Sequence, residues 1–209
     1  MITKKINGRG RPRGVDLEVA VSVAMKKFHR YGYDGVGVAE LSKTIGITAP
    51  SLYAAFGSKR QLFERALVHY AQSEGGWLPA ALAVGDSLEA SIANLLVRAT
   101  EVYTANPKRP GCLVIEGTRN CTDDKAKALT AGFYRATRQL ICDRITTSTP
   151  NLTEAEVDAL TDYAVMILVG LSGSARGGMT AQALRTTAEI AAEGFNQQLQ
   201  QYGHKGRSS

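Results

Sequence analysis

The side chains best suited to chemistry lie in one short segment of this sequence, residues 48–59. Thr48, Ser51 and Tyr53 place three hydroxyl groups within a six-residue stretch, and Lys59 follows soon after. Short hydroxyl side chains can hydrogen-bond to base edges and phosphates, and a lysine offers a compact positive charge to a phosphate. These residue types indicate recognition of nucleic acid rather than bond-breaking chemistry.

Side chains that could support catalysis or metal binding are scattered along the chain. The three histidines fall on different predicted elements, and none has a cysteine or carboxylate at the spacing of a metal site. The acidic residues are typical of solvated faces rather than of an acid–base pair. No glycine-rich phosphate loop follows a strand, because no strand is predicted. We therefore expect no enzymatic activity, no metal and no cofactor. The residues concerned are His29, His69, His204, Glu101, Glu116, Asp123 and Asp124.

Two short helices joined at a glycine must position the hydroxyl groups. The pattern predicts helices over 38–45 and 49–55, separated at Gly46, which tolerates the positive φ of a tight turn. Thr48 is a suitable N-cap for the second helix, and Pro50 fits its first turn, where no N–H is needed. The arrangement is a helix-turn-helix.

The residues of this unit divide into an inner and an outer face. Ser42 is small enough to let the two helices cross at a steep angle. The same pattern also occurs in all-α proteins that do not bind DNA, so by itself it leaves both interpretations open. The inner anchors are Leu41, Ile45, Ile47, Leu52 and Phe56, and the outer face of the second helix carries Thr48, Ala49, Ser51, Tyr53 and Ala54.

Positive charge is concentrated at the N-terminal end of the chain. The net charge is +6, yet residues 1–60 alone carry eleven Lys or Arg and four Asp or Glu. A basic third on a nearly neutral body is typical of a polyanion-binding head. The first fourteen residues hold five of these cations and no acid, which also fits a solvated basic tail. The five are Lys4, Lys5, Arg9, Arg11 and Arg13.

The rest of the chain is predicted to be helical. Apolar residues recur at spacings of three and four in every long segment, and period-2 alternation is absent. The first helix has the stripe Leu17, Val21, Ala24 and Phe28. Capping boxes at Ser58/Gln61 and Thr153/Glu156 open two later helices. We expect eight or nine helices, divided near residues 72–80, with 111–115 a short buried piece that is helical or not.

Three groups of residues together resemble the DNA-binding head of TetR/AcrR-family transcriptional repressors. They are Phe28-X-X-Tyr31-Gly32-Tyr33, then Ile47 to Phe56 with Leu52-Tyr53 inside it, then Ser58-Lys59-X-X-Leu62-Phe63. The resemblance spans about residues 15–70. It implies an all-α fold with an N-terminal three-helix helix-turn-helix head and a larger helical ligand-binding and dimerisation domain. Two positions depart from the family, which usually has Thr or Ser at Gly37 and Ala at Ser42.

The resemblance also implies roles for single residues. Tyr53 and Lys59 contact phosphates, and Thr48, Ala49, Pro50 and Ser51 enter the major groove. In the arm, Arg9-Gly10-Arg11-Pro12 resembles the core of an AT-hook, which inserts arginines into an A·T-rich minor groove; Arg13 follows it. An ordinary disordered basic tail remains the alternative for these residues.

A twofold dimer reading a palindromic operator follows from the same resemblance. The last two long helices are the expected dimer surface, through Ala164, Leu168, Leu171 and Ala175 and through Ala183, Thr187 and Ala191. The alternative is that both stripes line the core of the monomer.

The middle helices are expected to surround a cavity for an apolar or amphipathic small-molecule effector that releases the repressor from DNA. Residues at helical spacing are also common in a plain core, so this alternative stays open. The expected lining residues are Trp77, Tyr103, Leu113, Phe133 and Met166. Whether any of Cys112, Cys121 and Cys142 senses redox state is left open, since buried inert cysteine is common.

The expected organisation has four parts: a flexible basic arm (1–14), a helix-turn-helix DNA-binding domain (15–72), an effector-binding and dimerisation domain (73–203) and a tail (204–209). The apolar stretch 163–175 is too short to span a membrane, and no apolar region like that of a secretory signal follows the basic start. We expect a cytoplasmic homodimer that regulates transcription. The alternative is a nonspecific protein that binds AT-rich DNA through its arm.

Overall fold

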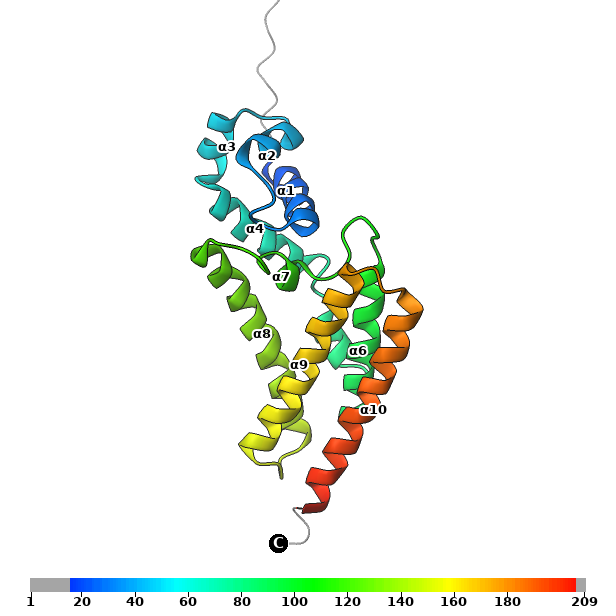
Figure 1. Cartoon of the computed structure of the whole chain (residues 1–209). Coiled ribbons are helices and arrows are strands. Elements are labelled where there is room, and N and C mark those ends of the chain that lie inside the picture. The colour runs from blue at the N-terminus through cyan, green and yellow to red at the C-terminus, as the bar shows by residue number, and fades with distance from the viewer. Residues whose placement is uncertain (1–15, 206–209) are drawn as a thin grey trace, which may run out of the picture.

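The computed structural model describes residues 16–205, and every regular element in that range is an α-helix (Figure 1). The helices are α1 (Leu17–Tyr31), α2 (Val38–Ile45), α3 (Ala49–Phe56), α4 (Lys59–Gln72), α5 (Leu78–Leu82), α6 (Leu88–Thr104), α7 (Leu113–Glu116), α8 (Asp124–Ser148), α9 (Glu154–Arg176) and α10 (Ala181–Lys205). We call α1–α4 the head and α5–α10 the body.

The head is built on α1, which packs along α4. The Asp16 side chain accepts hydrogen bonds from two N–H groups of the first turn, and Gly32 ends the helix at φ +74°. The stripe predicted for this helix is buried apart from Leu17, the first residue of the helix, which is 46% exposed. Phe28 packs edge-on against Phe63, with ring centroids 5.0 Å apart.

The turn between α2 and α3 has the predicted geometry. Gly46 adopts φ +82°, a left-handed conformation, and its N–H donates to Ser42 O. Thr48 caps α3 by accepting from Ser51 N at 3.3 Å. Gly37 caps α2 without any side-chain hydrogen bond, as its lack of a side chain requires. The Ser42 hydroxyl is buried where the helices cross and has no hydrogen-bond partner among the described residues.

The two predicted capping boxes differ in the structure. At α9 the box is complete, since Thr153 Oγ1 accepts from Glu156 N and the Glu156 carboxylate accepts from Thr153 N. At α4, Ser58 Oγ accepts from Gln61 N, but the Gln61 side chain bonds to the Ser58 hydroxyl at 3.0 Å. The N-terminus of α4 therefore has only the Ser58 half of the motif.

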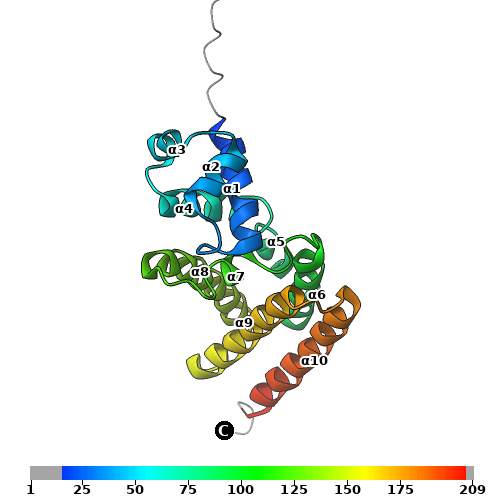
Figure 2. The same cartoon turned by 45° about the horizontal axis from the view of Figure 1, so that its top comes forward.

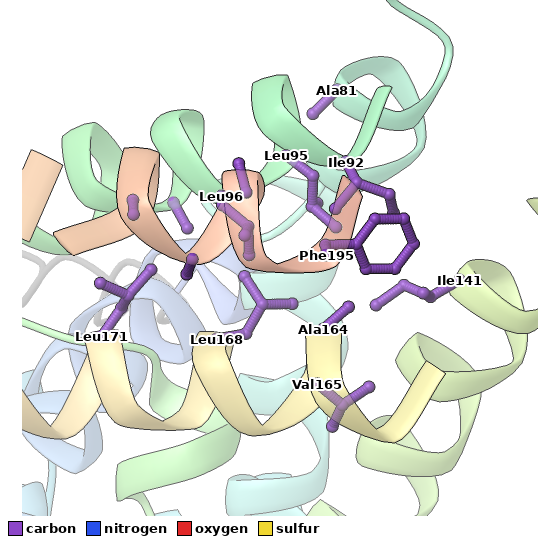
Figure 3. Close-up of a cluster of buried hydrophobic side chains, with 14 of the residues drawn as sticks. Ala81, Ile92, Leu95, Leu96, Ile141, Ala164, Val165, Leu168, Leu171 and Phe195 are labelled. Atoms are coloured by element: carbon purple, nitrogen blue, oxygen red, sulfur yellow. The ribbon is translucent and has the colours of Figure 1, made fainter. Parts of the chain in front are cut away.

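The body has its core between α6, α9 and α10, with α8 along one side (Figures 1 and 2). Figure 3 shows Phe195 of α10 among Ile92, Leu95 and Ile141. Two short helices, α5 and α7, bring the total to ten within residues 16–205, above the eight or nine expected, because segments of four or five residues are too short to show helical periodicity. α10 ends at Lys205, inside the segment expected to be a tail.

The outer faces of α9 and α10 differ from those expected. Ala164, Leu168, Leu171 and Ala175 are buried in the body core, as is Ala191, so the monomer-core alternative was right for these positions. Ala183 and Thr187 are exposed. The large apolar side chains that stay exposed on these two helices are Tyr163, Met166 and Ile190, which are 36%, 70% and 63% exposed.

α9 is also longer than its apolar stretch. By length and composition it is the one helix among residues 16–205 that could cross a membrane, since it runs from Glu154 to Arg176 and so extends beyond the apolar stretch 163–175 at both ends. Its buried face packs against α6, α8 and α10. α9 is therefore a core helix of this fold.

Candidate nucleic-acid interface

The outer face of α3 is open to solvent. Thr48, Pro50, Ser51, Tyr53 and Ala54 are exposed and Ala49 is half-buried. Leu52 and Phe56 point inward and are fully or almost fully buried in the head core. α3 packs on α2 and α4 and lies at the outer edge of the head (Figure 1). One face of α3 is thus supported by α2 and α4 and the opposite face is exposed to solvent. This is the geometry that a helix needs to enter a groove of DNA.

The hydroxyl groups on this face are already arranged by the cap. Thr48 Oγ1 and Ser51 Oγ share a hydrogen bond of 2.9 Å, in which either group could donate. Whichever group donates, each hydroxyl keeps either its O–H or a lone pair for a further partner, and Tyr53 two residues on is 49% exposed. The face therefore offers a small hydrogen-bonding surface and leaves Ala54 for apolar contact with a thymine methyl group.

Lys59 lies differently from the free ammonium expected at a helix N-terminus. Its Nζ is 4.2 Å from the centroid of the Tyr33 ring. Burial lowers the pKa of Lys59, and the nearby Asp34 carboxylate opposes this change. A cation–π contact contributes about 0.5–1 kcal/mol at an exposed site and about 2 kcal/mol when desolvated, so for this partly buried lysine the cost of leaving the ring for a phosphate lies between these values.

Tyr33 is itself held by the body. Its hydroxyl donates to Asp123 at 3.2 Å, and burial raises the pKa of this tyrosine to about 12. The neighbouring Asp34 accepts from both the N–H and the hydroxyl of Thr122. The loop after α1 is thereby tied to the segment before α8.

Arg9, Arg11 and Arg13, the predicted minor-groove residues, lie outside the described residues. The described part of the chain, 16–205, contains no group of three His, Cys, Asp or Glu side chains placed to hold a metal ion.

A cavity of about 220 Å³ opens where the head meets the body, and its wall is mostly apolar. Trp77, Tyr103 and Phe133 line it as predicted, and sequence reasoning missed Tyr70, Cys112 and Leu140. Tyr70 belongs to the buried face of α4, so its position in the sequence does not distinguish it from an ordinary core residue.

Two predicted cavity residues lie elsewhere. Leu113 is fully buried, but in the head core, because α7 turns this side chain toward α1 and α4. Met166 is 70% exposed on the outer face of α9, and its neighbour Val165 lines the cavity instead. One residue of offset rotates a helical side chain by about 100°, which accounts for the error.

Two of the three cysteines, Cys112 and Cys121, lie in surroundings that favour the thiol form. Burial raises the pKa of Cys112, which forms part of the cavity wall, and burial also raises the pKa of Cys121. Because the thiolate is the reactive form, both shifts lower reactivity at neutral pH.

A short exposed helix, preceded by a left-handed glycine turn and braced by two helices, defines a helix-turn-helix DNA-binding protein. Comparison with known proteins names the family. The family of bacterial regulatory proteins called tetR matches residues 20–66. The chain is 35% identical over 202 residues to the HTH-type transcriptional repressor BdcR of Escherichia coli (strain K12), covering 96% of this chain and 100% of that protein. The chain belongs to the TetR family.

Two further relatives agree. The HTH-type transcriptional repressor ComR of the same organism is 29% identical over 189 residues, covering 86% of this chain and 89% of ComR. A solved structure of a cysteine mutant of the TetR-family transcriptional regulator CifR, complexed with a 26bp double-strand operator DNA, superposes with a TM-score of 0.81. It is 29% identical and covers 88% of this chain and 98% of that chain.

Proposed function

We propose that this protein is a homodimeric transcriptional repressor that binds a palindromic operator. It dissociates from the operator when a small molecule fills the cavity where the head meets the body. The observation that carries the proposal is the exposed face of α3, a helix that follows the left-handed turn at Gly46 and is capped by Thr48. BdcR and ComR are named as repressors, and the CifR structure holds operator DNA, which supports the same activity here.

The residue roles belong to this proposal. Thr48, Ala49, Pro50 and Ser51 enter the major groove, and Tyr53 and Lys59 bind phosphates. Arg9, Arg11 and Arg13 add contacts in the minor groove. The DNA-binding domain spans 15–72 and the effector-binding and dimerisation domain spans 73–203. A DNA-binding regulator of this kind works in the cytoplasm without enzymatic activity.

The salt dependence of DNA binding tests the role of Lys59. Lys59→Ala should weaken binding to every sequence and lower the salt slope by about 1, because one fewer phosphate is neutralised. Fluorescence anisotropy across a salt series measures both quantities. Arg98→Ala, which removes one exposed cation from α6 in the body, should leave the slope unchanged. An unaltered slope in Lys59→Ala would show that the lysine stays on Tyr33.

Removing residues 1–14 separates specific from arm-led binding. A repressor that reads DNA through α3 should keep its sequence preference at reduced affinity. Binding that disappears altogether at moderate salt would favour the nonspecific alternative.

An apolar or amphipathic effector fits the wall of the cavity. Trp77 is the only tryptophan of the chain and lines this space, so its fluorescence reports whether the cavity is filled. Thr137 also lines it, and Thr137→Phe should reduce the fluorescence response to apolar ligands at least tenfold while leaving DNA affinity unchanged. Thr146→Phe, at an exposed site on the same helix, is the matched control. Equal responses from the two variants would place the effector elsewhere.

A further inference from the structure

Arg176, the last residue of α9, reaches across to the head. Its Nη1 donates to His29 O at 2.8 Å and to Pro110 O at 3.3 Å, and its Nη2 donates to Arg30 O at 2.8 Å. One guanidinium therefore connects α9 of the body, α1 of the head and the loop between α6 and α7. Figure 1 shows this loop rising beside α1, on the other side of the head from α3.

The end of α1 needs such a donor. The last carbonyl groups of a helix have no partner within the helix. Continuation of α1 would have supplied His29 O with the N–H of Tyr33, but that N–H donates instead to Gly117 O at 2.7 Å. Arg176 donates to His29 O in place of that N–H. Its positive charge also interacts favourably with the C-terminal end of the helix dipole.

The surrounding groups hold the same junction. His29 is buried, and burial lowers its pKa to about 4, so the ring is neutral at pH 7. Because a carbonyl can only accept, Nε2 of the neutral ring donates to Gly111 O at 3.0 Å, which leaves Nδ1 to accept from Arg109. Arg109 is paired in turn with Glu74. The loop is thus fixed to α1 next to the point where Arg176 binds.

On the outer side of the body, Met166 of α9 and Ile190 of α10 are 70% and 63% exposed. Tyr163 of α9 is 36% exposed and lies against α10, where its hydroxyl donates to Ala191 O at 3.0 Å. The proposed function, on which this inference rests, makes the protein a homodimer, and we take these exposed side chains of α9 and α10 as the surface that pairs two subunits. α9, which then takes part in pairing the subunits, ends in Arg176, whose side chain hydrogen-bonds to α1 of the head. The orientation of each head relative to the twofold axis then depends on these hydrogen bonds.

We propose that Arg176 is a positioning residue that sets the separation of the two heads and thereby selects the spacing between operator half-sites. It touches neither DNA nor effector. It acts by holding α1 at one angle to α9, so that both α3 helices meet grooves about one helical turn apart.

The test uses a palindromic duplex that the wild-type protein selects from random sequences. Versions with one or two base pairs added to or removed from the spacer are compared by measuring Kd, together with a duplex that keeps a single half-site. We expect wild type to lose at least tenfold in affinity per step away from the best spacing. Arg176→Met should lose about tenfold at the best spacing, should vary by less than about threefold across the series, and should match wild type on the single half-site.

The single half-site separates positioning from a merely structural role. A variant that weakens binding to one half-site as much as to two would have a damaged head, and the proposal would fail. It would fail equally if Arg176→Met kept the sharp spacing preference of wild type. Arg98→Met, which removes a guanidinium from the body away from the head, is the control and should behave as wild type.

Arg176→Lys keeps the test decisive if Arg176→Met does not fold. An ammonium retains the charge but lacks the planar pair of donors that reaches two carbonyl groups, so spacing selectivity should be intermediate. A spacing profile identical to wild type in this variant would overturn the proposal. If the wild-type protein selects no duplex at all, the proposed function itself is wrong, which is a different result from an unchanged spacing profile.

Discussion

Replacing Ser51 by Glu should reduce operator affinity at least 100-fold while leaving the protein folded. Ser51 is exposed on α3, three residues after the cap Thr48. A carboxylate about 4 Å from a phosphate costs about 1 kcal/mol in bulk water and about 4 kcal/mol at a protein surface. The repulsion is therefore comparable to the roughly 2.8 kcal/mol that a 100-fold loss requires.

The same substitution should not weaken the helix. Glu at this position can accept a hydrogen bond from Thr48 N, which would complete a capping box, and it places an acid at the positive end of the helix dipole. We expect a melting temperature equal to or slightly above that of wild type, measured by circular dichroism beside the binding assay. Loss of binding without loss of stability would locate the effect in the interface.

Ala90→Glu is the matched control. Ala90 is the third residue after the cap Ser87 and is exposed on α6 in the body. It gains the same side chain in the same helical position and should bind DNA as wild type does. Equal affinities for wild type and Ser51→Glu would mean that α3 does not face the DNA.

Replacing Phe63 by Ala should have the largest effect on stability. Phe63 is fully buried in the head, 5.0 Å from Phe28 and 5.1 Å from Tyr33 between ring centroids. Removing a buried phenyl group costs about 3–5 kcal/mol through lost burial and the cavity left behind. Since this is a large part of the stability of a typical domain, the head should unfold at much lower denaturant concentration.

Hydrogen exchange followed by mass spectrometry locates that loss. Amides of α1 and α4 should lose most of their protection, whereas amides of α6 and α10 should lose little, because those helices belong to the separate body core. Val68→Ala, an exposed position on the same helix as Phe63, should change stability by less than about 0.5 kcal/mol. A uniform loss of protection would show that head and body unfold together.

Local chemistry explains why much of the head could be predicted from the sequence. The turn at Gly46 and the cap at Thr48 depend on backbone geometry within a few residues, so both can be predicted from the residue types at these positions. The buried face of α4 likewise follows from the spacing of its apolar side chains. The position of Lys59 does not, because Tyr33 is distant in sequence and reaches it only through the packing of α1 on α4.

The body was harder to predict for the same reason. α9 is apolar on several faces, so periodicity could not separate Val165 in the cavity from Met166 on the surface. The short length of α7 left its helicity open, and its residues serve two sites: Leu113 belongs to the head core, and Val114 and Ile115 line the cavity. The role of Arg176 could not be predicted from the sequence, because its partners His29 and Arg30 are almost 150 positions away.

The crowding of tasks onto α9 has an evolutionary consequence. Within about three turns this helix supplies Val165 to the cavity, Met166 to the exterior and Arg176 to the head, so most substitutions there are pleiotropic. α8 borders the same cavity through Thr137 and Leu140, and Leu140 is partly open to solvent. Descendants of this gene that acquire a new inducer should therefore accumulate their adaptive changes on α8, while α9 drifts slowly.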